Sequence, residues 1–96
     1  MPTFDKTDQF KRDEARLALE EKAALKVALR KFLEDLPSRQ FRRGLRVKGI
    51  RSADGVFEMS WSGDGRATFQ YGPEVKPGET HVIWRRVGGH EILDAT

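Results

Sequence analysis

The side chains best suited to chemistry lie in the second half of the sequence. They are Glu58, Arg66, Arg85, Arg86 and His90. Histidine titrates near neutral pH and so donates or accepts a proton, and a carboxylate serves as a base. Arginine binds phosphate through two parallel N–H groups. Together these residue types suit proton transfer beside a bound phosphate.

Strand alternation predicts which of these side chains share a surface. Residues 56–62 and 66–71 alternate between apolar and polar side chains, joined by the turn sequence SGDG. Successive side chains of a strand point to opposite faces, so Glu58 and Arg66 fall on the polar face, with one of Arg85 and Arg86. Glu58 is then either a general base or an ion-pair partner of Arg66. His90 is either an acid–base group or an ordinary surface histidine.

A strongly basic segment precedes these strands. Acidic and basic residues balance over residues 1–38, and acidic residues are in excess over residues 52–96. Between them lie six basic residues with no acidic residue among them, here called the basic segment: Arg39, Arg42, Arg43, Arg46, Lys48 and Arg51. Such a cluster attracts polyanions. The segment is therefore either a nucleic-acid contact or a solvated basic loop.

The secondary structure expected around these residues is helical first and extended afterwards. Residues 8–36 are rich in helix formers and carry an apolar stripe, with Thr7 or Asp8 as the cap and Pro37 as the end. We expect a hairpin of two helices, broken near Leu19, because a single helix of this length overhangs a small domain. Four strands are expected, at residues 45–50, 56–62, 66–71 and 81–87.

This order predicts an α+β fold, with the helices on one face of a mainly antiparallel sheet of about four strands. The chain of 96 residues is expected to form one domain, residues 1–96. Trp84 is expected in the core, with base stacking as the alternative. Gly88 and Gly89 allow a bend before His90, and His81 is expected to be structural or neutral.

Composition narrows the classes of function. The chain has no cysteine, and its two histidines match no familiar ligand spacing, so we expect neither a disulfide nor a metal or other cofactor. No signal-like N-terminus and no apolar run of about 20 residues occur, so we expect a cytoplasmic protein without membrane contact. An arginine-rich polar face beside a basic segment suits metal-free cleavage of RNA, in which the 2′-hydroxyl is activated by a base.

The ordered set of strand sequences resembles a known family. PTFDKTDQF, LRVKGI, VFEMSW, GRATFQYG and HVIWRRVGGHEIL follow one another in this chain. In this order they resemble the RelE/ParE superfamily, the bacterial toxins of type II toxin–antitoxin pairs, and most of all its RelE- and YoeB-like mRNA interferases. The resemblance implies a short first strand at PTFDKTDQF, then two helices and an antiparallel sheet.

The resemblance also implies roles for single residues. Lys48 matches the basic residue of the strand after the helices, and Arg66 matches the arginine that holds the scissile phosphate. His90 matches a proposed acid or base near the C-terminus, and Arg85 and Arg86 are basic neighbours on the last strand. The chain departs from the family in two places. Glu91 stands where YoeB-like chains have tyrosine, and Arg46 stands at the position of their catalytic glutamate, for which Glu58 is a candidate substitute.

The function implied is that of a metal-independent, ribosome-dependent mRNA endonuclease, neutralised by a cognate antitoxin. Its partners are then the antitoxin and mRNA on the ribosome. Two alternatives stay open: a non-enzymatic inhibitor of DNA gyrase like the ParE toxins, and a catalytically inactive relative that binds nucleic acid.

Overall fold

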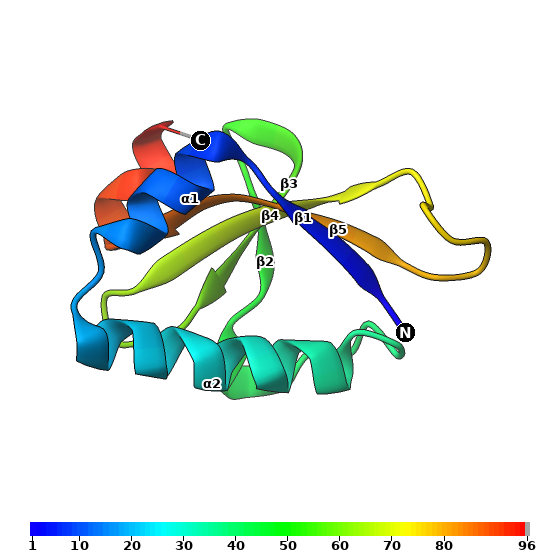
Figure 1. Ribbon diagram of the computed structural model, residues 1–96, viewed down its shortest axis with the longest axis horizontal. Coiled ribbons are helices and arrows are strands. Elements are labelled where there is room, and N and C mark those ends of the chain that lie inside the picture. The colour runs from blue at the N-terminus through cyan, green and yellow to red at the C-terminus, as the bar shows by residue number, and fades with distance from the viewer. Residues whose placement is uncertain (96) are drawn as a thin grey trace.

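Within the part of the chain that the structure describes, the fold consists of five strands, two α-helices and two short 3₁₀ helices. The computed structural model describes residues 1–95. In chain order the elements are β1 (Thr3–Lys6), α1 (Asp8–Ala15), α2 (Leu19–Asp35), the 3₁₀ helix η1 (Arg43–Leu45), β2 (Lys48–Ile50), β3 (Ala53–Ser60), β4 (Arg66–Gly72), β5 (His81–Gly88) and the 3₁₀ helix η2 (His90–Ala95). Figure 1 shows α2 running along one side of the twisted sheet.

The five strands form one mixed sheet in the order β1-β5-β4-β3-β2. The pairs β2–β3, β3–β4 and β4–β5 are antiparallel. The edge strand β1 pairs with β5 in parallel. The predicted α+β fold with a mainly antiparallel sheet is confirmed. The fifth strand is the short first strand that only the resemblance implied, since four residues are too few to show a period.

Two helices replace one long helix, as expected. Thr7 caps α1, because its hydroxyl accepts a hydrogen bond from the backbone N–H of Phe10 at 3.1 Å. At the start of α2, the Glu21 carboxylate accepts a hydrogen bond from the N–H of Ala18 at 2.8 Å. Helix α2 ends at Asp35, two residues before Pro37, where proline disfavours helical geometry at the preceding residue.

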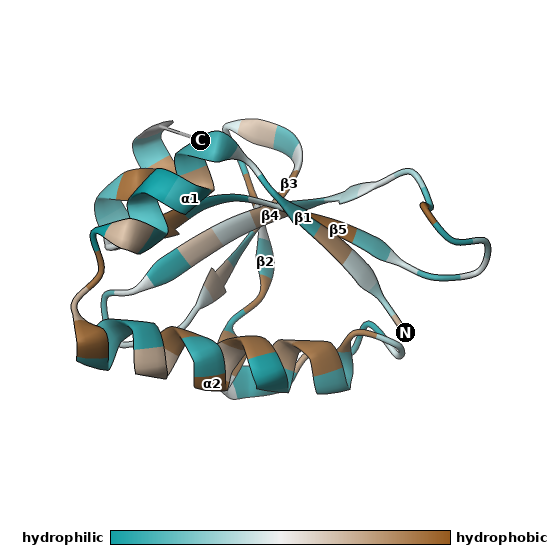
Figure 2. Cartoon of the chain, in the orientation of Figure 1, coloured by the Kyte–Doolittle hydropathy of each residue, from teal (hydrophilic) through white to brown (hydrophobic). Residues whose placement is uncertain are grey.

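An aromatic cluster joins α2 to the sheet. Phe32 of α2 lies with its ring centroid 5.1 Å from that of Trp84 and 5.0 Å from that of Phe69. Phe10 of α1 also contacts Trp84, with 6.1 Å between the two ring centroids. The expected core position of Trp84 is confirmed. Figure 2 shows hydrophobic residues recurring along α2 between hydrophilic ones, the pattern of a helix with one buried side.

All four expected strands differ somewhat in their bounds, most of all β2 and β3. Strand β2 covers only Lys48–Ile50, because Leu45 belongs to η1 and is buried in the core there. Strand β3 begins earlier than expected, at Ala53, and pairs with β2 through a register shift. Strand β5 ends at Gly88, and the chain bends at Gly89 into η2. The predicted bend before His90 is therefore present.

His81 ties the edge strand β1 to β5. Its Nδ1 lies 2.7 Å from the hydroxyl of Thr3, and its Nε2 lies 3.0 Å from a carboxylate oxygen of Asp5. The ring is buried. Because Thr3 stands directly opposite His81 in the parallel register, the two hydrogen bonds connect neighbouring strands. The structural role expected of His81 agrees with these contacts.

Candidate active site

One carboxylate lies between two cations on three neighbouring strands. Lys48 of β2 stands directly opposite Glu58 of β3. Arg66 of β4 stands opposite Ser60, so Arg66 and Glu58 are diagonal neighbours. Glu58 Oε1 lies 3.7 Å from Lys48 Nζ and 4.0 Å from Arg66 Nε. Of the two roles left open for Glu58, the ion pair with Arg66 is present, and Lys48 completes a charged row across the sheet.

The polar face that carries this row is largely buried, although its residues are polar or charged. Glu58 is only 7% exposed and Arg66 only 8%, and Ser60 and Thr68 are buried as well. Lys48 is the open member of the row, with 63% of its side chain exposed. The middle of β3 and β4 is therefore closed to solvent on this face. Of the three charged residues, Lys48 is therefore the one that solvent reaches.

The chain after β5 covers one end of this face. Gly88 stands directly opposite Arg66 in the register of β4 and β5. A Cβ atom on Gly88 would come within 3.0 Å of the side chain of Ile92 in η2. Ile92 is itself buried. Helix η2 thus folds back beside Arg66 and removes this end of the face from solvent.

The β3–β4 turn fixes the orientation of Arg66. Its Nη1 donates hydrogen bonds to the backbone oxygens of Gly65 at 2.9 Å and Gly63 at 3.4 Å. The indole N–H of Trp61 donates to the backbone oxygen of Arg66 at 3.0 Å. A guanidinium held in this way keeps its charge in one place, which is what stabilisation of a developing negative charge requires.

His90 lies beside the same turn but outside the charged row. It begins η2, it is exposed, and its backbone N–H lies 3.4 Å from a carboxylate oxygen of Asp64, which it approaches as a donor. Asp64 belongs to the turn whose carbonyl groups hold Arg66. Within residues 1–95, the imidazole of His90 makes no hydrogen bond. The structure therefore brings His90 to the neighbourhood of Arg66 without joining it to Glu58.

A bulge in β5 sends Arg85 and Arg86 to different partners. The register shifts between Thr68 and Phe69 of β4, which leaves one extra residue on β5. Arg85 donates to the amide oxygen of Gln70, on the polar face, at 2.5 Å. Arg86 Nε donates to Asp13 of α1 at 2.7 Å. Arg86 stands opposite Thr68 of the polar face, and Arg85 is bound to Gln70 of the same face, so the bulge removes the strict alternation on which the expectation of one arginine per face depended. The charge of Arg86 is bound to Asp13 of α1.

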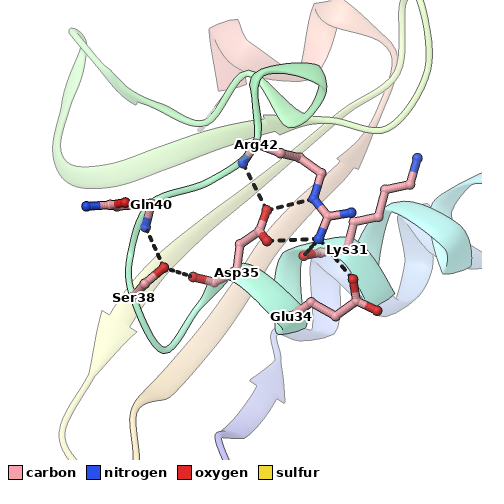
Figure 3. Close-up of polar contacts among 6 residues, drawn as sticks. All are labelled: Lys31, Glu34, Asp35, Ser38, Gln40 and Arg42. Carbon is pink, nitrogen blue, oxygen red and sulfur yellow. Dashed lines mark hydrogen bonds and ion pairs between the residues drawn. The ribbon is translucent and has the colours of Figure 1, made fainter.

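Acidic residues of α2 bind one member of the basic segment. Arg42 donates to both carboxylate oxygens of Asp35, at 2.8 Å each, and to Glu34 at 2.9 Å (Figure 3). The hydrogen bonds from Arg42 lower the pKa of Asp35 from 3.8 to about 2, and those bonds raise the pKa of Arg42 above its usual value. Arg42 thus anchors the loop after α2. Its charge is bound to carboxylates and is not available to a polyanion.

The other members of the basic segment face outward. The guanidinium of Arg39 lies over the ring of Tyr71, 4.0 Å from its centroid. Arg43, Arg46 and Arg51 are exposed. Arg39 and Arg46 both have a positive φ, 56° and 49°, a conformation that L-residues other than asparagine and aspartate seldom adopt. The segment is therefore folded into η1, β2 and the turns beside them, with its basic side chains at the surface.

Sequence reasoning did not find Asp13, Asp64 and Tyr71. Asp13 binds Arg86, Asp64 contacts His90, and Tyr71 contacts Arg39. Each contact joins residues far apart in the chain, so no local period marks it.

Among residues 1–95, no three histidine, aspartate or glutamate side chains lie together as a metal site. The same part of the chain contains no helix both long and apolar enough to cross a bilayer.

The fold is similar to those of known toxins. No protein-family model matches the chain, and no curated protein matches it significantly. Among solved structures, a mutant of YafQ from E. coli is 12% identical, with 97% of this chain and 98% of that chain covered and a TM-score of 0.69. A chain of the RelB–RelE antitoxin–toxin complex from Methanococcus jannaschii is 16% identical, with 95% of both chains covered and a TM-score of 0.61.

A third match supports the same architecture. A chain of the intact E. coli RelBE toxin–antitoxin complex is 18% identical, with 93% of this chain and 96% of that chain covered and a TM-score of 0.60. The protein therefore has a RelE-like fold over nearly its full length. The expected RelE-like architecture is confirmed.

Proposed function

We propose that this chain is the toxin of a toxin–antitoxin pair and that it cleaves mRNA on the ribosome without a metal. In this proposal residues 1–96 form one toxin domain. The RelE-like fold supports the proposal, since RelE and YafQ occur in solved complexes with the antitoxins RelB and DinJ. The observation that carries the enzymatic part is the position of Glu58 between Lys48 and Arg66.

The proposed reaction uses the 2′-hydroxyl of the RNA as the nucleophile. Glu58 accepts the hydroxyl proton, and the 2′-oxygen attacks the adjacent phosphorus. The bond to the 5′-oxygen breaks, which leaves a 2′,3′-cyclic phosphate and, after protonation, a free 5′-hydroxyl. Arg66 and Lys48 stabilise the negative charge that builds up on the phosphate oxygens. DNA lacks the hydroxyl and is not cleaved in this way.

His90 is the proposed acid for the leaving oxygen. Its exposed position beside the β3–β4 turn lets substrate reach it. Arg85, on the polar face, is proposed to contact the RNA chain. The exposed members of the basic segment, Arg43, Arg46 and Arg51, are proposed to attract RNA from solution.

The proposed partners are a cognate antitoxin and the translating ribosome, which places the protein in the cytoplasm. The antitoxin is proposed to cover the basic surface with an acidic or amphipathic segment, or to add a strand to an edge of the sheet. Both β1 and β2 are edge strands, and both are short.

One observation favours a non-enzymatic alternative. The guanidinium of Arg66 is buried and bound to two carbonyl groups of its own turn, and the imidazole of His90 is not directed to Glu58 by any hydrogen bond within residues 1–95. A gyrase inhibitor, or an inactive relative that binds nucleic acid, requires no such catalytic set.

The experiment that tests the proposal is primer extension on a reporter mRNA in a translating extract. The purified protein is expected to produce cuts in phase with the codons. Glu58→Gln and Arg66→Gln are expected to remove them, because each deletes a charge of the row. Glu20→Gln removes an exposed carboxylate from α2 and serves as the matched control. An uncut message with folded wild-type protein would contradict the enzymatic proposal, and DNA supercoiling by gyrase would be measured next.

A further inference from the structure

A surface depression adjoins the charged row at Lys48. It is a cleft of about 310 Å³ between the loop that follows α2 and strands β2, β3 and β4. We call it the aromatic cleft, and it is lined by Arg39, Phe41, Val47, Lys48, Phe57 and Tyr71. Lys48 belongs both to this cleft and to the charged row, so the two meet at the edge strand β2, although Phe57 and Glu58 point to opposite faces of the sheet.

Aromatic rings form the floor of the aromatic cleft. Phe57 and Tyr71 lie with their ring centroids 5.6 Å apart at an angle of 65°. Phe57 in turn stacks on the buried ring of Phe69, at 5.5 Å and 21°. Both rings of the floor are only partly buried, although they pack against the core. The rings are therefore held by the sheet and still offer a surface to a ligand.

Cations border the aromatic cleft, and one of them already stacks on the floor. The guanidinium of Arg39 lies 4.0 Å from the centre of the Tyr71 ring. Arg39 reaches this place from a backbone with φ 56° in the loop after α2. Lys48, on the edge strand β2, is exposed as well. The ring surface of Tyr71 thus accepts a flat group, and positive charge is available on two sides of it.

We propose that the aromatic cleft binds one nucleotide of single-stranded RNA, with the base stacked on Tyr71 and Phe57 and the flanking phosphates bound by Arg39 and Lys48. Aromatic side chains beside a cationic groove are the usual means of binding unpaired bases. An incoming base takes the place of the guanidinium on the ring. Arg39, which is exposed and belongs to a loop, then turns to the neighbouring phosphate.

The charge of the surroundings favours RNA over a protein segment as the occupant. Arg43, Arg46 and Arg51 are exposed near the aromatic cleft in the chain and make no ion pair within residues 1–95. The acidic residue nearest the lining along the sheet is Glu58, which is buried and bound to Lys48. Phe57 and Glu58 are neighbours on β3, so their side chains point to opposite faces, and a nucleotide in the cleft meets the charged row only at Lys48 on the edge strand β2. The inference rests on the proposed function only in taking RNA as the substrate.

Binding to a short RNA that cannot be cleaved tests the cleft separately from catalysis. The probe is a fluorescein-labelled single-stranded RNA with 2′-O-methyl groups, and its anisotropy is measured against protein concentration. Tyr71→Leu is expected to weaken binding about tenfold, the scale of one base stacked on an aromatic ring. Tyr71→Phe keeps the ring and is expected to bind as the wild type does. A thermal unfolding curve confirms that each variant is folded.

A pair of charge variants separates the aromatic cleft from general attraction of polyanions. Arg39→Gln and Lys22→Gln each remove one positive charge, and Lys22 lies on α2, outside the cleft. Arg39→Gln is expected to weaken RNA binding several times more than Lys22→Gln does. Inorganic polyphosphate has no bases, so its binding is expected to be the same for Tyr71→Leu and the wild type.

Three outcomes would overturn the inference. The first is that folded Tyr71→Leu binds RNA as tightly as the wild type. The second is that Tyr71→Leu loses as much affinity for polyphosphate as it loses for RNA. The third is that the wild type shows no measurable RNA binding. Protection of the cleft by a protein partner alone, with RNA binding unchanged by Tyr71→Leu, would assign the cleft to that partner. Tyr71-dependent binding together with an uncut reporter mRNA would uphold the cleft and contradict the nuclease proposal.

Discussion

Asp13 of α1 and Arg86 of β5 form an ion pair with 2.7 Å between Oδ2 and Nε. The same oxygen accepts a hydrogen bond from the backbone N–H of Val87 at 3.2 Å, and Gln9 donates to the other oxygen at 3.0 Å. Burial raises the pKa of Asp13, but the hydrogen bonds from Arg86, Gln9 and Val87 outweigh it, so the pKa lies below 3.8. One carboxylate therefore attaches the first helix to the bulged end of β5.

Removal of this carboxylate is expected to destabilise the protein strongly. Asp13→Ala leaves Arg86 and the N–H of Val87 without their partner, and loss of one member of a buried ion pair costs about 3 kcal/mol. The free energy of unfolding in urea measures the change. Lys11→Ala, at an exposed position of the same helix, is the control and is expected to change it by less than about 0.5 kcal/mol. A loss below about 1 kcal/mol for Asp13→Ala would show that the pair is not structural.

The ion pair between Asp35 and Arg42 predicts a loss of stability in acid. Hydrogen bonds from Arg42 lower the pKa of Asp35 to about 2, from 3.8. A carboxyl group whose pKa is lower in the folded state contributes stability above its unfolded pKa, and this contribution is lost as the pH falls through the folded value. We expect the contribution of Asp35 to be complete above about pH 4 and to decline towards pH 2.

Urea unfolding of the wild type and of Asp35→Asn over this range measures the effect. The difference between the two proteins is expected to be constant near neutral pH and to shrink between about pH 4 and pH 2. NMR titration of the Asp35 carboxyl carbon gives its pKa directly. A midpoint at the ordinary 3.8 would mean that Arg42 is not bound to Asp35 in solution.

Two glycines near the candidate active site are expected to tolerate a side chain differently. A Cβ on Gly65 would collide with the ring of Trp61, which is fixed by its hydrogen bond to the backbone oxygen of Arg66. Gly65→Ala is therefore expected to cost about 2 kcal/mol through overpacking. A Cβ on Gly89 would meet only the carboxylate ends of Glu91 and of the turn aspartate, both on exposed residues that can move.

We expect Gly89→Ala to cost less stability than Gly65→Ala, while displacing His90. Thermal unfolding compares the stabilities, and the mRNA cleavage assay compares the activities. A Gly89→Ala protein that is stable but cleaves poorly would support a role for the position of His90. Equal melting temperatures for Gly65→Ala and wild type would contradict the tight contact with Trp61.

Substitution of His81 is expected to loosen β1 without unfolding the rest of the sheet. His81→Ala removes the partners of Thr3 and Asp5, which corresponds to about 2 kcal/mol for two hydrogen bonds. Amide exchange at Thr7, whose N–H donates to the backbone oxygen of Trp84, is expected to become faster. Exchange at Phe69, in the middle of the sheet, is expected to rise less. Unchanged exchange at Thr7 would show that the backbone pairing alone holds the strand.

Local patterns in the sequence predicted most of the elements. The apolar stripe gave the helical region, and alternation gave β3 and β4 with their turn. The same alternation placed Glu58 and Arg66 on one face, but it did not reveal the bulge in β5 at Arg85. These predictions succeed because side-chain direction repeats every two residues in a strand and every 3.6 residues in a helix. Strand β1 is too short for any period, so only the resemblance to a family indicated it.

The tertiary structure decided what each of these side chains contacts. The burial of Glu58 and Arg66 depends on η2 and on neighbouring strands, which alternation does not reveal. The ion pair between Asp13 and Arg86 joins residues 73 positions apart. The sequence by itself therefore determined which residues share a face, because that follows from backbone geometry. The tertiary structure alone decided which of their charges are paired and which stay open to a ligand, because that depends on contacts between segments distant in the chain.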